Sequence, residues 1–146
     1  MSQNPFVVTA VSSRAGAAYR AALETQGFEV ADAVDGFEAV DLTLQYRPAL
    51  IVLDEQVPGL SAISVCAMLK ARAATDRIPI IIVCTQHDRA HQERFVEAGA
   101  DQVLVEPCAP DLLGVEAKRL ARAAAAGRVP SHLRRRSADA RFIESS

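Results

Sequence analysis

The chain has 146 residues, of which 50% are hydrophobic and 23% are charged, with a net charge of −2. These values fit one globular domain with a hydrophobic core and exclude a fibrous or disordered chain. They give no general preference for nucleic acid or membrane surfaces. The apolar runs are too short to span a bilayer, and the N-terminus has no signal-peptide pattern. An odd number of cysteines argues against a secreted disulfide framework, so we expect a cytoplasmic protein with reduced thiols.

Strand and helix patterns alternate along the chain. Apolar runs typical of buried strands occupy residues 6–11, 28–33, 49–53, 80–83 and 102–105. Helical spacing follows each run: from a cap at Ser12 or Ser13 to Gly27, around residues 39–44, from Ser61 to about Ala73, from Asp88 to Gly99, and from Pro110 onward. Leu112, Leu113 and Leu120 are the expected anchors of the last helix.

This fivefold alternation with short connections predicts an α/β fold, a doubly wound parallel sheet with helices on both faces. Sites in such sheets form at the carboxyl ends of the strands. Function is therefore expected at Val11–Ser13, Asp54–Gly59, Cys84–Gln86 and Glu106–Cys108.

The last twenty residues differ in composition from the rest. We expect residues 1–126 to form the domain and residues 127–146 to form a flexible basic tail, in which five arginines outnumber Asp139 and Glu144. A solvated tail and a short docking segment are both consistent with this composition.

Several motifs, in their order and spacing, resemble the response regulator receiver family over about residues 6–121. The motifs are PALIVLDEQVPG around Asp54, RIPIIIVCT at the fourth strand and EAGADQVLVEP at the fifth, with ETQGFEV and DGFEAVDL earlier in the chain. The resemblance implies a flavodoxin-like three-layer α/β/α fold with strand order 2-1-3-4-5. It also implies a part in two-component or phosphorelay signalling.

The resemblance also implies a chemistry. Receivers accept a phosphoryl group from a histidine kinase on an aspartate that corresponds to Asp54, with Pro58 four residues later. The transferred charge is neutralised by Mg²⁺, held by an acidic pair after the first strand, and by a lysine before the proline after the fifth strand. A Thr or Ser at the end of the fourth strand bonds the phosphoryl group, and an aromatic residue in the fifth strand acts as a switch.

This sequence departs from the family at those supporting positions. The acidic pair falls at Ala10 and Val11, or Val11 and Ser12, and the lysine is replaced by Glu106 before Pro107. The hydroxyl position is Cys84, with Thr85 next, and the aromatic position is Val103. We expect little or no Mg²⁺ binding and, if Glu106 lies near Asp54, repulsion of phosphate and a raised pKa of Asp54.

Three further hypotheses concern metal binding and thiol chemistry. Asp54 and Glu106 offer a pair of carboxylates for a metal. Cys84 and Cys108 end neighbouring strands and suggest a thiol redox switch, or an enzyme using one of them. His87 and His91 are spaced i, i+4 on the fourth helix, but no third metal ligand is evident.

We therefore predict a non-enzymatic, atypical single receiver that retains Asp54 and works by protein–protein interaction. The expected interaction face contains Gln86, His87, Arg89, His91, Gln102 and Leu104. Its partner would be a histidine kinase or a downstream signalling protein, or a second copy in a homodimer. No DNA-binding domain or membrane partner is expected. The alternatives are a receiver phosphorylated on Asp54 and a redox module using Cys84 and Cys108.

Overall fold

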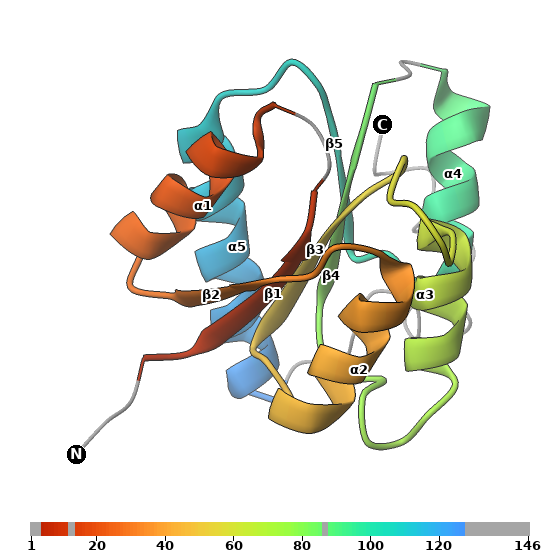
Figure 1. Cartoon of the computed structure of the whole chain (residues 1–146), viewed down its shortest axis with the longest axis horizontal. Helices are drawn as coiled ribbons and strands as arrows, with labels where there is room; N and C mark the ends of the chain where they lie inside the picture. The colour runs from red at the N-terminus through yellow and green to blue at the C-terminus, as the bar shows by residue number, and fades with distance from the viewer. Residues whose placement is uncertain (1–3, 12–13, 86–87, 128–146) are drawn as a thin grey trace.

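The sheet is built on two central strands in the computed structural model, which describes residues 4–11, 14–85 and 88–127. β3 (Leu50–Asp54) and β4 (Ile80–Cys84) are buried along their whole length, as expected for apolar strands covered on both faces. β1 (Phe6–Ala10) pairs with β3, β2 (Glu29–Asp32) pairs with β1, and β5 (Gln102–Val105) pairs with β4. All pairs are parallel and the order is β2-β1-β3-β4-β5, which confirms the predicted fold (Figure 1).

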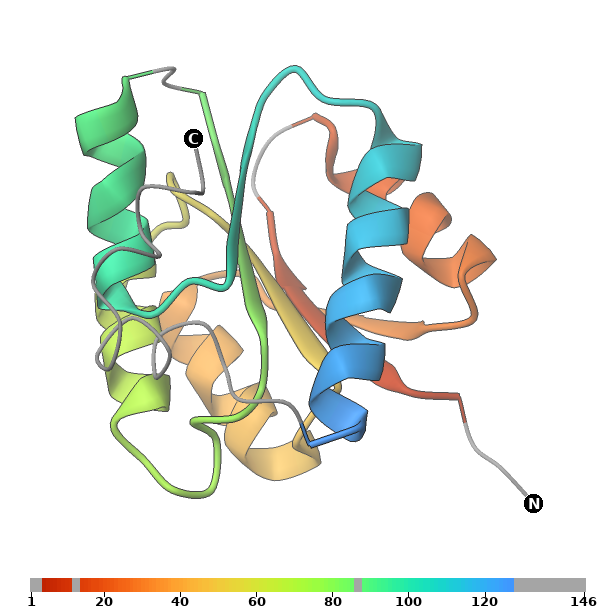
Figure 2. The same cartoon turned by 180° about the vertical axis from the view of Figure 1, so that it is seen from behind.

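Helices cover both faces of this sheet (Figures 1 and 2). The described helices are α1 (Gly16–Thr25), α2 (Gly36–Tyr46), α3 (Ala62–Lys70), α4 (Arg89–Ala98) and α5 (Pro110–Ala125). α1 and α5 pack on one face, and α2, α3 and α4 pack on the other. The fold therefore has the three layers that the alternation of patterns predicts.

Alternate residues of the strands enter two separate cores. Ile80 and Ile82 pack with Phe95 in the core under α2, α3 and α4. Ile81 and Val83 pack in the core under α1 and α5, together with buried side chains of those helices: Tyr19, Leu23, Leu113 and Ala117. The period of two in a strand places neighbouring residues in different cores.

Side-chain caps fix the beginnings of three helices. Asp35 Oδ1 accepts a hydrogen bond from the Glu38 backbone N–H at 2.8 Å, and Glu38 Oε1 accepts one from the Val34 N–H at 2.7 Å. Ser61 caps α3 and Asp88 caps α4 in the same way. These caps satisfy backbone donors that would otherwise lack a partner in the first turn.

Two glycines allow close approach between elements. A Cβ atom at Gly36 would lie 2.1 Å from the Leu60 carbonyl oxygen, so only glycine lets α2 begin against the loop after β3. A Cβ atom at Gly114 of α5 would lie 3.1 Å from the Ala22 carbonyl oxygen of α1, so glycine keeps these two helices close.

The structure corrects three details of the sequence prediction. α3 ends at Lys70 rather than near Ala73. α1 begins after Ala15 without a side-chain cap, and the predicted caps Ser12 and Ser13 lie outside the described residues. Leu112 is 46% exposed, and Leu113 and Leu120 are the leucines that anchor α5. Leu113 and Leu120 are two helical turns apart and face the same core, whereas Leu112 is adjacent to Leu113 and therefore points in another direction.

The described part of the chain ends shortly after α5. α5 ends at Ala125, and Gly127 has a positive φ of 80°. The predicted tail lies outside the described residues from position 128 onward. Within the part of the chain that is described, no helix combines the length and apolar character needed to cross a bilayer.

Candidate functional site at the carboxyl edge of the sheet

Asp54 is the last residue of β3, and its position at the carboxyl edge of the sheet agrees with its predicted one. The residue is only 4% exposed. The backbone N–H of Gln56 donates to Asp54 Oδ1 at 2.9 Å, and the N–H of Val57 donates to its carbonyl oxygen at 3.0 Å. The turn after β3 is thus closed by Asp54 itself, with its carboxylate held at the strand end.

The end of β1 offers no acidic side chain beside Asp54. Ala10 pairs in register with Leu53, and Val11 follows it, half-buried against the core under α1 and α5. Ser12 lies outside the described residues. Alanine and valine have no side-chain oxygen, whereas Mg²⁺ requires oxygen ligands. The described residues at this strand end therefore do not fit the Mg²⁺ site that receivers use.

Glu106, at the position where the resemblance implies lysine, is bound by a buried tyrosine of α1. The Tyr19 hydroxyl donates to Glu106 Oε2 at 2.6 Å and lies 3.4 Å from Cys108 Sγ. Tyr19 is 1% exposed, and the Glu106 N–H donates to the Cys84 carbonyl at 2.6 Å. This cluster joins α1 to the turn between β5 and α5, which contains a cis peptide bond before Pro107.

The tyrosine in this cluster is held in its protonated form. Burial raises the pKa of Tyr19 well above its ordinary value, and the contacts with Cys108 and Glu106 raise it further. A neutral phenol can donate its proton to a carboxylate, whereas a phenolate would repel one. The Tyr19 hydroxyl is therefore a protonated donor to Glu106 at neutral pH.

Glu55, next to Asp54, is bound from the other side of the sheet. His91 Nε2 of α4 lies 2.8 Å from Glu55 Oε1, and Thr85 Oγ1 lies 3.5 Å from Glu55 Oε2. The side chain of Glu55 is 9% exposed. A groove of about 400 Å³ runs beside this contact, between the loop after β3, α3 and α4, and Arg94 and Phe95 line it. Glu55 therefore links the end of β3 to α4.

No group of three or more His, Cys, Asp or Glu side chains capable of holding a metal ion occurs among the described residues. The predicted Asp54–Glu106 pair thus has no third such ligand within that part of the chain, and Glu106 is bound by Tyr19. Of the two histidines spaced i, i+4, His87 lies outside the described residues, and α4 begins after it at Arg89. His91 contacts Glu55 instead.

The prediction that Cys84 and Cys108 form a redox pair is wrong, because their side chains lie in different cores. Cys84 is fully buried in the core under α2, α3 and α4, whereas Cys108 packs against the core under α1 and α5. Strands four and five are neighbours, but the two thiols belong to opposite faces of the sheet. All three cysteines are free thiols, and burial raises the pKa of Cys66 to about 12, which keeps its thiol protonated.

The fifth strand requires one correction. Leu104 is 7% exposed and packs in the core under α1 and α5, so it cannot belong to the predicted interaction face. Val103 faces the opposite core and is partly buried there, and Gln102 is half-buried. Because both faces of β5 carry apolar residues, the sequence does not indicate which of its side chains is exposed.

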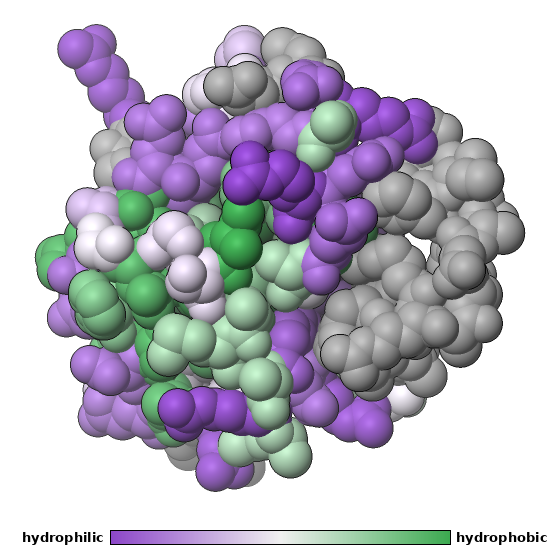
Figure 3. Space-filling view, turned by 90° about the vertical axis from the view of Figure 1, so that its right-hand side faces the viewer, coloured by the Kyte–Doolittle hydropathy of each residue, from purple (hydrophilic) through white to green (hydrophobic). Residues whose placement is uncertain are grey.

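Two other residues of the predicted interaction face, Arg89 and His91, lie on α4. Arg89 is exposed and forms an ion pair with Glu93 at 3.0 Å, and His91 packs edge-on against Phe95. Gln86 and His87 lie outside the described residues. In the space-filling view from the α3–α4 side, hydrophilic residues gather over the upper part of the molecule, where α4 lies (Figure 3).

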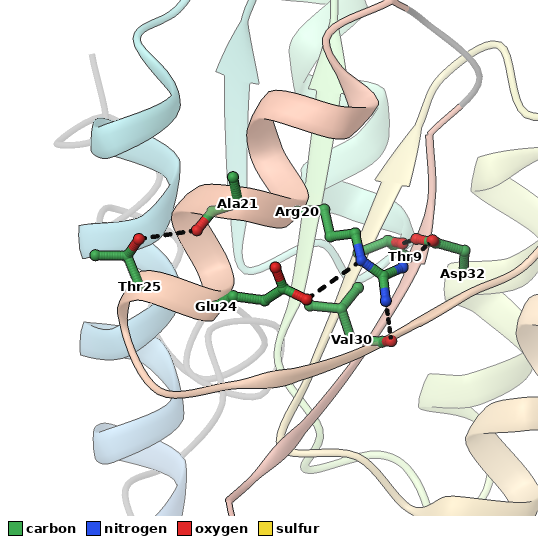
Figure 4. Close-up of polar contacts among 7 residues, drawn as sticks. All are labelled: Thr9, Arg20, Ala21, Glu24, Thr25, Val30 and Asp32. Carbon is green, nitrogen blue, oxygen red and sulfur yellow. Dashed lines mark hydrogen bonds and ion pairs between the residues drawn. The ribbon is translucent and has the colours of Figure 1, made fainter.

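An arginine of α1 is engaged at the edge of the sheet beside β2. Arg20 forms ion pairs with Asp32 and Glu24 and donates to the Val30 carbonyl oxygen at 3.3 Å (Figure 4). Asp32 also accepts a hydrogen bond from Thr9 of β1. An acidic residue does occur near this corner, at the end of β2, but it is bound to Arg20.

Sequence reasoning missed both contacts that hold the glutamates. Neither Tyr19 nor Glu55 is among the candidate site residues that the sequence predicts. The available signal was a single polar aromatic residue on the otherwise alanine- and leucine-rich buried face of α1, since a buried Tyr hydroxyl usually needs a partner.

Comparisons with known proteins agree with the fold. The family model described as response regulator receiver domain matches residues 13–118. The phosphate regulon transcriptional regulatory protein PhoB of Rhizobium meliloti is 37% identical over 103 residues, which cover 70% of this chain and 45% of PhoB. The transcriptional regulatory protein PrrA of Mycobacterium tuberculosis is 40% identical over 85 residues, 58% of this chain and 36% of PrrA. This chain spans less than half the length of both relatives.

Solved structures show the same fold. The signal receiver domain of a signal transduction histidine kinase from Syntrophus aciditrophicus has a TM-score of 0.72 and 28% identity, covering 81% of this chain and 90% of that one. The receiver domain of the sensor histidine kinase PA1611 from Pseudomonas aeruginosa, solved with magnesium in its active site cleft, has a TM-score of 0.74 and 22% identity, covering 82% and 98%.

Proposed function

The chain belongs to the family of response regulator receiver domains, and from this membership we propose that it is an atypical receiver that signals by binding a protein partner. In this proposal Asp54 is a retained structural residue, and phosphoryl transfer is not the input. The domain has no catalytic activity of its own and works in the cytoplasm, with a histidine kinase or a downstream signalling protein as its partner.

The contact between Tyr19 and Glu106 carries the proposal. A phosphoryl group on an aspartate needs nearby positive charge, which receivers obtain from a metal and a lysine. Here the lysine position holds a carboxylate whose oxygen lies 2.6 Å from a buried hydroxyl. The fixed cation is therefore replaced by an anion that the fold holds in place. Ala10 and Val11 at the end of β1 support the same conclusion, because their side chains cannot bind a metal.

The contact between Glu55 and His91 supports a binding surface held in one state. It joins the residue after Asp54 to α4 at 2.8 Å. α4 presents Arg89 as an exposed side chain beside it, and Gln102 of β5 is half-buried. We propose that this α4–β5 surface, without Leu104, is the one that binds the partner. A homodimer through the same surface stays a prediction.

Treatment with a phosphoryl donor tests the proposal directly. The full chain is incubated with Mg²⁺ and acetyl phosphate, or with beryllofluoride, and followed by intact mass and by amide NMR spectra. We expect no added phosphoryl mass and no Mg²⁺-dependent shift of amides in α4 or β5. An Mg²⁺-dependent response in the wild-type protein that disappears in Asp54→Asn would refute the proposal.

A phospho-accepting receiver is the second candidate, and one observation favours it. Asp54 is the last residue of β3, and Pro58, at the position that the resemblance implies, accepts a hydrogen bond from the Gly36 N–H on its carbonyl oxygen at 2.9 Å, which connects the loop after β3 to α2. The reverse substitution Glu106→Lys separates the candidates. If the site is disabled by the loss of its cations, Glu106→Lys should react faster with acetyl phosphate than the wild-type protein does. If the wild-type protein already accepts phosphate on Asp54, it should react without this substitution.

A further inference from the structure

Positive and negative charges are separated along the chain. Residues 118–146 contain eight Lys or Arg and two Asp or Glu, a net charge of +6, whereas residues 1–117 contain eight and sixteen, a net charge of −8. The basic part begins on α5, inside the folded domain. A segment with this excess of positive charge attracts anionic partners.

The basic part begins at a groove between α5 and the end of α1. The groove has a volume of about 560 Å³ and is lined by Gln26, Val115, Lys118, Arg119, Arg122 and Ala123. Three of these six residues are cationic and none is acidic. Since both helices begin at the carboxyl edge, this groove lies toward the opposite end of the molecule from Asp54 (Figure 2).

Two of the three cationic side chains in the groove already have partners within the domain. Lys118 Nζ donates to the Gln26 carbonyl at the end of α1 at 2.8 Å, which holds the two helix surfaces together. Arg119 forms an exposed ion pair with Glu116 at 2.6 Å. Such exposed pairs are weak, so Arg119 can exchange Glu116 for a carboxylate of a partner. Arg122 is exposed on the same side of the helix.

The exposed face of α5 is apolar at one end and cationic at the other. Leu112, Val115, Arg119 and Arg122 follow at spacings of three, four and three, which places them along one face. Leu112 is 46% exposed and Val115 is 52% exposed. Exposed aliphatic side chains that lead into a group of cations form a surface with two chemistries on one helix.

We propose that this groove binds an acidic amphipathic helix of a partner protein. Leucine-type side chains of that helix would cover Leu112 and Val115, and its carboxylates would pair with Arg119 and Arg122. A nucleic acid would pair with the cations but would leave the aliphatic end uncovered. A second copy docked through the same face would bring like charges together. The proposal does not depend on the state of Asp54.

Amide NMR of the full 146-residue chain provides the test. The probe is a synthetic helical peptide with leucines on one face and glutamates on the other. Its controls are the same peptide with lysines for the glutamates and a short DNA duplex. We expect the glutamate peptide to shift amides of residue 26 and residues 112–123, with weaker binding at high salt. We expect the lysine peptide to cause no shift.

Matched variants identify the residues responsible. Arg119→Glu with Arg122→Glu should weaken binding of the glutamate peptide by about tenfold or more, because two attractive pairs become repulsive. Val115→Asp should also weaken it. Arg72→Glu with Arg77→Glu reverses two exposed charges elsewhere and should leave binding unchanged. The proposal is overturned if the peptide shifts α4 instead, if both double variants behave alike, or if the DNA duplex shifts the same amides with equal affinity.

Discussion

At the amino edge of the sheet a buried lysine neutralises an aspartate, whereas at the carboxyl edge two glutamates are held by a tyrosine and a histidine. Lys70 Nζ lies 3.1 Å from Asp101 Oδ2, and the two side chains are 5% and 4% exposed. Lys70 also donates to the carbonyl oxygens of Asp76 and Ile78, and Asp101 accepts from the Ile80 N–H at 2.9 Å. Both charges are thus fully bonded among themselves and the backbone.

The difference shows that this fold places acidic side chains in two settings, a buried ion pair at one edge and contacts between loops and helices at the other. The amino-edge pair ties α3 to the beginnings of β4 and β5, and both of its charges are buried. At the carboxyl edge, each glutamate links one loop to one helix, Glu106 to α1 and Glu55 to α4. Breaking the first contact should weaken the whole domain, and breaking either of the others should have smaller and more local effects.

The largest effect is expected from Lys70→Met. This substitution leaves Asp101 buried without its cation, which typically costs about 3–5 kcal/mol. We expect urea unfolding to show a loss of that size in the free energy of unfolding. Adding Asp101→Asn should recover part of it, because the unpaired charge is removed. An unchanged urea midpoint in Lys70→Met would mean that the ion pair at the amino edge contributes no more to stability than the contacts at the carboxyl edge.

A smaller loss is expected from Tyr19→Phe. It removes a hydrogen bond to a charged group, which contributes roughly 1.5–3 kcal/mol. Because the folded-state pKa of Tyr19 is raised above the value of about 10 for an unfolded chain, its contribution is full below pH 10 and is lost as the pH rises above that value.

The measurement is urea unfolding of both proteins at neutral pH and above pH 10. The difference in unfolding free energy should shrink at the higher pH. While both proteins are folded, their phenolate absorbance should be equal, since Tyr19 stays protonated. Extra phenolate absorbance from folded wild-type protein would show that the cluster does not hold the tyrosine as described.

The smallest effect is expected from His91→Ala. It removes one partly exposed contact to Glu55, worth about 1 kcal/mol. We expect amides of α4 to exchange about fivefold faster with solvent, while amides of β3 and β4 keep their rates. Glu93→Gln breaks the exposed Arg89–Glu93 pair on the same helix and serves as the control, with little expected change. Equal rates of amide exchange in both variants would show that the contact between Glu55 and His91 does not stabilise α4.

The sequence was sufficient for the fold because its strongest signals are local. The uninterrupted apolar runs of β3 and β4 require helices on both faces, and Asp88 begins a helix where the pattern indicates. β5 shows where local signals end. Val103 and Leu104 are both apolar, so only the pairing of β5 with β4 determines which core each one enters.

The candidate site was predictable in position but not in its contacts. Asp54 and Glu106 follow the strand pattern, and both lie at the predicted edge. Tyr19 and Glu106 are 87 positions apart in the sequence, and Glu55 and His91 are 36 apart. Their contacts depend on the rotation of α1 and α4 about their own axes. The spacing of apolar residues shows which face of each helix is buried, but it does not show which polar side chain of another element that face meets. The redox pair failed for a similar reason, since strand adjacency does not determine which face a side chain occupies.

The glycine at the crossing of α1 and α5 has a consequence for recognition. With Gly114 against the Ala22 carbonyl and Lys118 bonded to Gln26, the two helices meet backbone to backbone and leave little room to slide. A partner arriving at this crossing would meet a surface already in its final shape and would lose little affinity to ordering it. Replacing Gly114 by a larger residue would separate the helices, and the same recognition would then carry an entropic cost.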